Sequence, residues 1–127
     1  MAIMPKYFTI EDANLAVEVI KPVMARLMAL RLKIIDKQPE AWPVIEKAAG
    51  NGGNRTTSLL AMEFDEINRL VKDIQSTGAE LKDLNLGLLD FRSIREGRDV
   101  YLCWKYGEGQ IAYWHEIESG FAGRQPI

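Results

Sequence analysis

Apolar residues recur three and four positions apart in the first third of the chain, the spacing of one face of an α-helix. Thr9 followed by Asp12 is typical of a helix N-terminus, and the pattern lasts until about Lys37, shortly before Pro39. Pro22 lies inside this helix and is expected to kink it, because proline removes a backbone hydrogen bond. The residues that carry the pattern are Ala13, Val17, Ile20, Met24, Leu27 and Ile34.

A second amphipathic helix is predicted from about Ser58 to Thr77, with Gly78 as its C-terminal stop. The two helices are expected to form a long antiparallel hairpin over residues 9–77. Aligning their apolar stripes places Arg31 level with Glu63, and both charges fall within those stripes. Since an unpaired buried charge is strongly destabilising, we predict a structural ion pair between Arg31 and Glu63.

The connector between the helices, about residues 38–57, has a different character. A short helix is expected around Ala41–Ala49, and the glycine- and asparagine-rich stretch from Gly50 to Asn54 is expected to be a surface loop. Neither a Walker pattern nor GxGxxG occurs there, so a phosphate-binding loop is disfavoured.

The last third, about residues 80–127, predicts a small antiparallel β-meander with strands near 80–82, 88–91, 100–105 and 111–116. A simple hairpin register pairs Trp104 with Tyr113, Cys103 with Trp114 and Leu102 with His115. One face would then pack on the helices, and the other would form an interface or a ligand wall. The first face carries Val100, Leu102, Trp104, Ile111, Tyr113 and His115; the second carries Tyr101, Cys103, Lys105, Ala112, Trp114 and Glu116. The fold class expected is a single α+β domain spanning residues 1–127.

Several segments of this C-terminal third resemble the signature of an uncharacterised prokaryotic family, domain of unknown function number 2203. They are Gly87–Phe91 (GLLDF), Leu102–Trp104 (LCW), Gly107–Glu108, Trp114–Glu116 (WHE) and Gly120–Pro126 (GFAGRQP). The similarity extends more weakly through Tyr7–Ala13 and Gly78–Asp83, and it covers most of the chain except the connector. The resemblance implies a shared fold and carries over no activity, cofactor or catalytic residue.

The composition of the chain limits the classes of partner that it is expected to bind. The net charge of −2 supplies no basic field for nucleic acid, so nucleic acid is an unlikely partner despite the aromatic residues on the predicted strands. The single cysteine rules out an internal disulfide and suits a reducing compartment. No signal peptide or membrane-spanning stretch is visible, so we expect a cytoplasmic protein that uses no membrane.

Most of the residues that could bind a ligand or a metal lie near the C-terminus. His115, Glu108, Glu116 and Arg124 form a candidate ligand site for a small anion or a metal. The favoured alternative for Arg124 is a structural clamp that pairs with Glu116 or Glu118. Weaker metal candidates combine His115 with Glu63 or Glu66 of the second helix. In the predicted register Cys103 and His115 lie on opposite faces, which argues against a joint metal site and against a cysteine nucleophile activated by histidine.

Two functions from different classes therefore stay open. The first is a non-catalytic accessory protein that self-associates into a homo-oligomer, with a dimer expected, through the first helix and the second sheet face. The apolar residues left over on that helix are Leu15, Val19, Met28, Leu32 and Ile35. The alternative is a small-anion or metal-binding protein with its site around His115 and Arg124. The sequence leaves open whether it is an enzyme.

Overall fold

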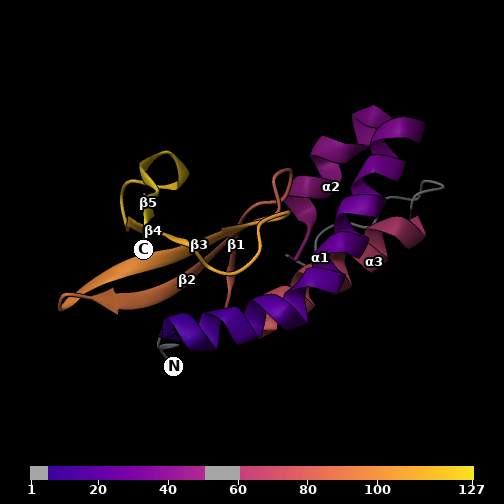
Figure 1. Cartoon of the computed structure of the whole chain (residues 1–127). Coiled ribbons are helices and arrows are strands. Elements are labelled where there is room, and N and C mark those ends of the chain that lie inside the picture. Colours follow the sequence, from indigo (N-terminus) through magenta and orange to yellow (C-terminus); the bar gives the residue numbers. More distant parts are fainter. Residues whose placement is uncertain (1–5, 51–60) are drawn as a thin grey trace, which may run out of the picture.

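A computed structural model describes residues 6–50 and 61–127, and it has the α+β architecture expected. Helix α1 spans Ile10–Lys37 and begins as predicted, because the Thr9 side chain accepts a hydrogen bond from the Asp12 backbone N–H. The helix continues through Pro22, and its axis changes direction along its length (Figure 1). Every third or fourth residue of α1 is buried, so its apolar stripe forms one wall of the core.

Helix α3 spans Ala61–Ser76 and packs beside α1 (Figure 1). Phe64, Ile67 and Ile74 are buried against the α1 stripe. Gly78, with a φ of 97°, ends the helical region at the predicted position, in a conformation that favours glycine. The predicted start of this helix at Ser58 and most of the predicted loop, residues 51–54, lie outside the described residues.

The connector carries a short helix, as expected. A 3-10 turn, Pro39–Ala41, leads into helix α2, Trp42–Ala48, and Trp42 and Ile45 are buried against the hairpin. Side chains of α2 contact the long helices, and the apolar pattern of those helices does not predict these contacts.

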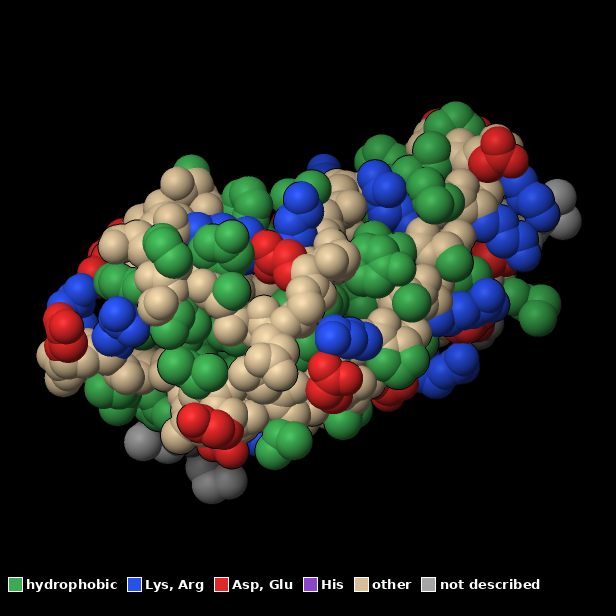
Figure 2. All heavy atoms as spheres, viewed as in Figure 1, with side chains coloured by type: hydrophobic (Ala, Val, Ile, Leu, Met, Phe, Trp, Pro, Cys, Tyr) green, Lys and Arg blue, Asp and Glu red, His purple; other side chains and the backbone are tan. Residues whose placement is uncertain are grey.

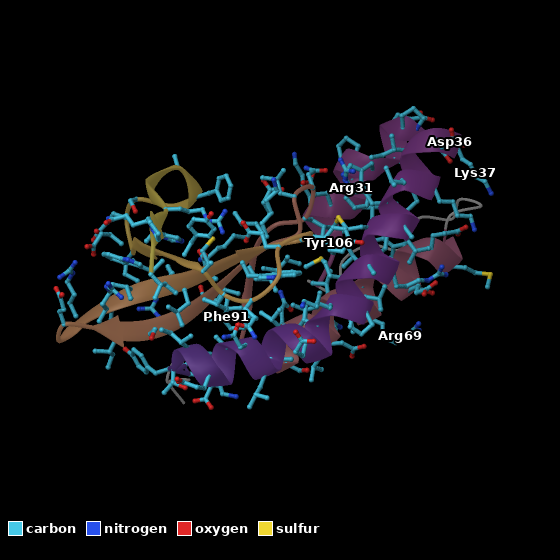
Figure 3. The ribbon with its side chains drawn as sticks, viewed as in Figure 1. Arg31, Asp36, Lys37, Arg69, Phe91 and Tyr106 are labelled. Atoms are coloured by element: carbon cyan, nitrogen blue, oxygen red, sulfur yellow. The ribbon has the colours of Figure 1, made fainter. Side chains whose placement is uncertain are left out.

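The predicted ion pair between Arg31 and Glu63 is wrong. Arg31, which is labelled in Figure 3, instead donates from Nε to Asn85 Oδ1 at 2.9 Å, and its guanidinium lies over the Trp42 ring. Glu63 lies 3.6 Å from Lys33, measured from Oε1 to Nζ. Helical-wheel arithmetic set the two charges level, but Arg31 is on the side of α1 that α2 and the β1–β2 turn cover.

The sheet is a five-stranded antiparallel meander in the order β1-β2-β3-β4-β5. Its strands are Glu80–Asp83, Leu88–Arg95, Arg98–Lys105, Tyr113–Glu116 and Gln125–Pro126, with a 3-10 turn, Phe121–Gly123, before the last. Figure 1 shows the C-terminal segment, in yellow, on the opposite side of the sheet from α1. The helices therefore lie on one side of β2 and β3, and the C-terminal segment lies on the other.

The predicted register of β3 and β4 is wrong by one residue. Cys103 pairs with Tyr113, Leu102 with Trp114 and Tyr101 with His115. Ile111 does not join the strand: its backbone N–H donates to Asn14 Oδ1 of α1 at 2.7 Å, and its side chain enters the core. Because side chains alternate along a strand, this shift moves His115 to the face that carries Cys103.

The two faces of the sheet are therefore composed as follows. The helix-facing face carries the buried apolar residues Leu89, Phe91, Val100, Leu102, Trp104 and Trp114. Phe91 lies between the sheet and α1 (Figure 3). The outer face carries Asp90, Arg92, Tyr101, Cys103, Tyr113 and His115. Most of its central residues are nonetheless buried, by side chains of the chain itself.

Candidate metal centre

Three potential metal ligands, Asp90, Cys103 and His115, meet at the centre of the outer face. They come from β2, β3 and β4: Asp90 is the direct cross-strand partner of Cys103, and His115 pairs with Tyr101, the adjacent residue on the same face. One ligand atom from each lies within 4.8 Å of the other two. Their exposed fractions are 3%, 0% and 1%, and no histidine surface is visible on the face shown in Figure 2. No other group of this kind occurs in residues 6–50 and 61–127.

Both ring nitrogens of His115 face oxygen atoms. Nδ1 lies 2.7 Å from the Glu116 carbonyl oxygen, and Nε2 lies 2.9 Å from Asp90 Oδ1. A carbonyl oxygen only accepts, so Nδ1 carries the proton and donates. Nε2 and the carboxylate must then share a further proton or, in its place, another cation. A histidine whose Nδ1–H is fixed to a carbonyl presents Nε2 as metal-ligating histidines do.

Cys103 is a thiol in this environment. Burial raises its pKa to about 12, and the negative charge of Asp90 raises it further than Arg124 lowers it. A catalytic cysteine needs the opposite shift, with a histidine nitrogen available as base. Here both nitrogens of His115 already face oxygen atoms, so the arrangement does not favour nucleophilic catalysis even though the two residues share a face.

Arg124 and Glu108 lie at the edge of this cluster. Glu108 Oε1 accepts from Arg124 Nη2 at 2.7 Å and from the Lys105 backbone N–H at 2.8 Å. Burial acts to raise the pKa of Glu108, but the hydrogen bonds from Arg124 and Lys105 outweigh it and hold that pKa below its usual value. The Arg124 guanidinium lies 4.0 Å from the centre of the Tyr113 ring and 4.9 Å from that of Phe121.

The donor set fits a borderline divalent ion such as Zn²⁺, which accepts sulfur, imidazole nitrogen and carboxylate oxygen together. With metal–ligand lengths of about 2.0–2.3 Å, donor atoms of a tetrahedral site lie roughly 3.4–3.6 Å apart. The observed range, from 2.9 Å between Nε2 and Oδ1 to within 4.8 Å for the set, brackets that spacing.

Comparison with known proteins adds one finding. A family model described as "Uncharacterized conserved protein (DUF2203)" matches residues 6–127. The chain belongs to the DUF2203 family. No curated protein and no solved structure matches the chain. The family assignment confirms the resemblance seen in the sequence.

The four residues expected to form a ligand site in this DUF2203 chain do not converge. Arg124 pairs with Glu108, whereas Glu116 lies on the helix-facing side and accepts from Arg98 Nη2 at 2.5 Å. His115 is buried with Asp90 instead. Arg124 does clamp the chain end, as the favoured alternative held, but its carboxylate partner is Glu108 and not Glu116 or Glu118.

The acidic residues of the second helix are also elsewhere. Glu66 forms a bidentate pair with Arg26, and Glu63 lies beside Lys33. Neither belongs to the cluster of Asp90, Cys103 and His115 that the described residues contain.

Asp90 is the candidate metal ligand that the sequence did not predict. It stands inside the apolar run Leu88–Leu89–Asp90–Phe91, where a charged side chain on a central strand needs a buried partner. That signal was present in the sequence. The identity of the partner was not, because it depends on the β3–β4 register.

No helix within the described residues is long and apolar enough to cross a membrane.

Proposed function

We propose that this protein binds a divalent transition-metal ion, Zn²⁺ in the first instance, through Asp90, Cys103 and His115. The observation that carries the proposal is the convergence of three different donor types from three adjacent strands on one buried point. Buried polar groups of this kind are uncommon unless they are paired or coordinate a metal.

Charge balance supports a divalent ion. With Asp90 and Cys103 ionised and His115 neutral, the ligands carry two negative charges, which a divalent cation neutralises. Without the ion, protons must serve the same role: one lies between His115 and Asp90, and one stays on the thiol. Metal binding therefore releases protons, and the apparent affinity should rise with pH by up to about tenfold per unit for each proton displaced.

The number of ligands also matters. Structural zinc sites use four protein ligands, whereas catalytic sites use three and leave a position for water or substrate. The described residues supply three, so the proposed centre has the ligand count of a reactive site. A thiolate ligand suits a reducing compartment, which is consistent with a cytoplasmic location.

The composition of the chain makes this proposal easy to test. Cys103 is the only cysteine and His115 the only histidine, so every thiolate or imidazole signal has one possible source. Tag-free protein, treated with a chelator, should bind one equivalent of Co²⁺ and develop a thiolate-to-cobalt charge-transfer band. Zn²⁺ should abolish that band by displacement.

Variants define the ligands. Asp90→Asn, Cys103→Ser and His115→Asn should each weaken Co²⁺ binding, and Cys103→Ser should remove the charge-transfer band. The matched control is Glu116→Gln, next to His115 but on the other face, which should bind as the wild type does. A folded wild-type protein that binds neither ion at micromolar concentration, or that binds without the thiolate band, would refute the proposal.

Self-association is a second candidate, favoured by exposed apolar side chains on α1. Leu15, Val19 and Leu32 are 70%, 64% and 62% exposed, whereas the centre of the outer sheet face, the other predicted interface, is buried by the chain itself. We therefore restrict the homo-oligomer proposal to α1. Sedimentation equilibrium should show a dimer that Val19→Glu dissociates, and a monomeric wild type at high concentration would exclude it.

A further inference from the structure

The guanidinium of Arg124 has hydrogen-bonding capacity that the rest of the chain does not use. Its side chain is 13% exposed, and its Nε is buried without a hydrogen-bond partner among the described residues. Nη2 is bonded to Glu108, and the rings of Tyr113 and Phe121 hold the planar group in position. A buried donor left unpaired is destabilising, so such groups usually indicate an acceptor that belongs there.

Arg124 is also placed next to the proposed metal ligands. Tyr113, on which the guanidinium stacks, is the direct cross-strand partner of Cys103. Directly opposed side chains on a sheet have Cβ atoms roughly 4.5–5.5 Å apart, which puts the Arg124 group over the cysteine side of the cluster. The positive charge of Arg124 accordingly acts to lower the pKa of Cys103, against the larger effects of burial and Asp90.

We propose that the open coordination position of the metal accepts a small oxyanion, such as a simple carboxylate or bicarbonate, and that Arg124 binds it. This inference rests on the proposed metal centre. One oxygen of the anion would be the fourth metal ligand, and a second would accept from Arg124 Nε–H. A hydrogen bond from a charged guanidinium N–H to a carboxylate oxygen is among the stronger hydrogen bonds in proteins.

Two features restrict the ligand class. The cluster is buried, so the anion must be small. Glu108 already pairs with the Arg124 charge, and Asp90 and Cys103 balance the ion, so each charge on the anion is left uncompensated and a singly charged anion is tolerated better than a doubly charged one. Formate, acetate and bicarbonate meet both conditions; phosphate and sulfate do not.

The test uses full-length Co²⁺-loaded protein and follows the visible d–d bands during titration with each anion. Formate, acetate and bicarbonate should change the bands with saturation, while phosphate and sulfate at equal ionic strength should not. Arg124→Met should keep the thiolate-to-cobalt band and weaken anion affinity roughly ten- to a hundredfold, the loss of a charged hydrogen bond. Arg124→Lys should lie between the two.

Glu108→Gln separates binding from a merely structural clamp. It removes the carboxylate that competes for Arg124, so anion affinity should stay equal or increase, whereas a clamp role predicts the same loss as Arg124→Met. Visible d–d bands that are insensitive to every anion, or equally sensitive in Arg124→Met, would overturn this inference alone. Absence of the band in folded wild-type protein would overturn it together with the metal site.

Discussion

The two faces of the same sheet follow different rules. On the helix-facing side, neighbouring strands contribute apolar side chains that pack into a continuous core with α1 and α3. On the outer side, the same strands contribute an aspartate, a cysteine and a histidine that are just as buried. Stability requires the first face to be apolar, but it does not require the second to gather three polar groups. The contrast teaches that the outer face is where this fold has room for chemistry.

The largest expected effect on stability concerns two neighbouring residues of β2 whose side chains point to opposite faces of the sheet. Phe91→Ala should lower the free energy of unfolding by about 3–5 kcal/mol, because it leaves a cavity between sheet and helix. Asp90→Asn should cost less, because it keeps the volume and one hydrogen-bonding group, yet it should abolish tight metal binding. Urea unfolding of both variants measures the first quantity and Co²⁺ titration the second. The contrast between the faces fails if Asp90→Asn costs as much as Phe91→Ala and binds Co²⁺ normally.

A smaller effect is expected from alkaline pH. The pKa of Cys103 is raised from 9.0 to about 12 in the folded protein, so its contribution to stability is complete below pH 9. That contribution should fall as pH rises from about 9 to about 12, because the unfolded thiol ionises while the buried thiol does not. Cys103→Ala removes this dependence. The difference in unfolding free energy between metal-free wild type and variant should therefore shrink with pH, and a constant difference would contradict the raised pKa.

The smallest effect concerns the clamp at the rim of the outer face. The Arg124–Glu108 pair is partly exposed, so Glu108→Gln should cost roughly 0.5–1 kcal/mol or less. Since the pKa of Glu108 is lowered in the fold, the contribution is present above about pH 4.5, the usual value, and is lost as pH falls through the folded pKa. Thermal unfolding of wild type and variant at neutral and acidic pH measures it. The difference should vanish in acid and persist at neutral pH.

The helices and strands could be predicted from the sequence because each has a local sequence signal. The period of α1, the Thr9 cap, the short helix after Pro39 and the glycine-bounded strands all depend on residues close together in the chain. The placement of Val100, Leu102 and Trp104 toward the helices followed from alternation alone and is confirmed.

The site could not be predicted because it depends on pairing between strands. Alternation shows which residues of one strand share a face, but it does not show which residues of the next strand join them. Ile111 leaves β4 to bond with Asn14 on α1, a contact between residues far apart in sequence, and that decides the face of His115. The predicted ion pair of Arg31 was wrong for a related reason: its partners, Asn85 and Trp42, belong to elements outside the two long helices.

The meander order of the strands has a consequence for motion. β4 is only four residues long, and its backbone bonds to β3 and the two-residue β5, so its contact with β2 is made by side chains, His115 against Asp90. An ion held by Asp90 and His115 would strengthen this link across the intervening strand. Hydrogen exchange of the β4 amides should then slow markedly when metal is added, because the shortest inner strand would open as rarely as the centre of the sheet.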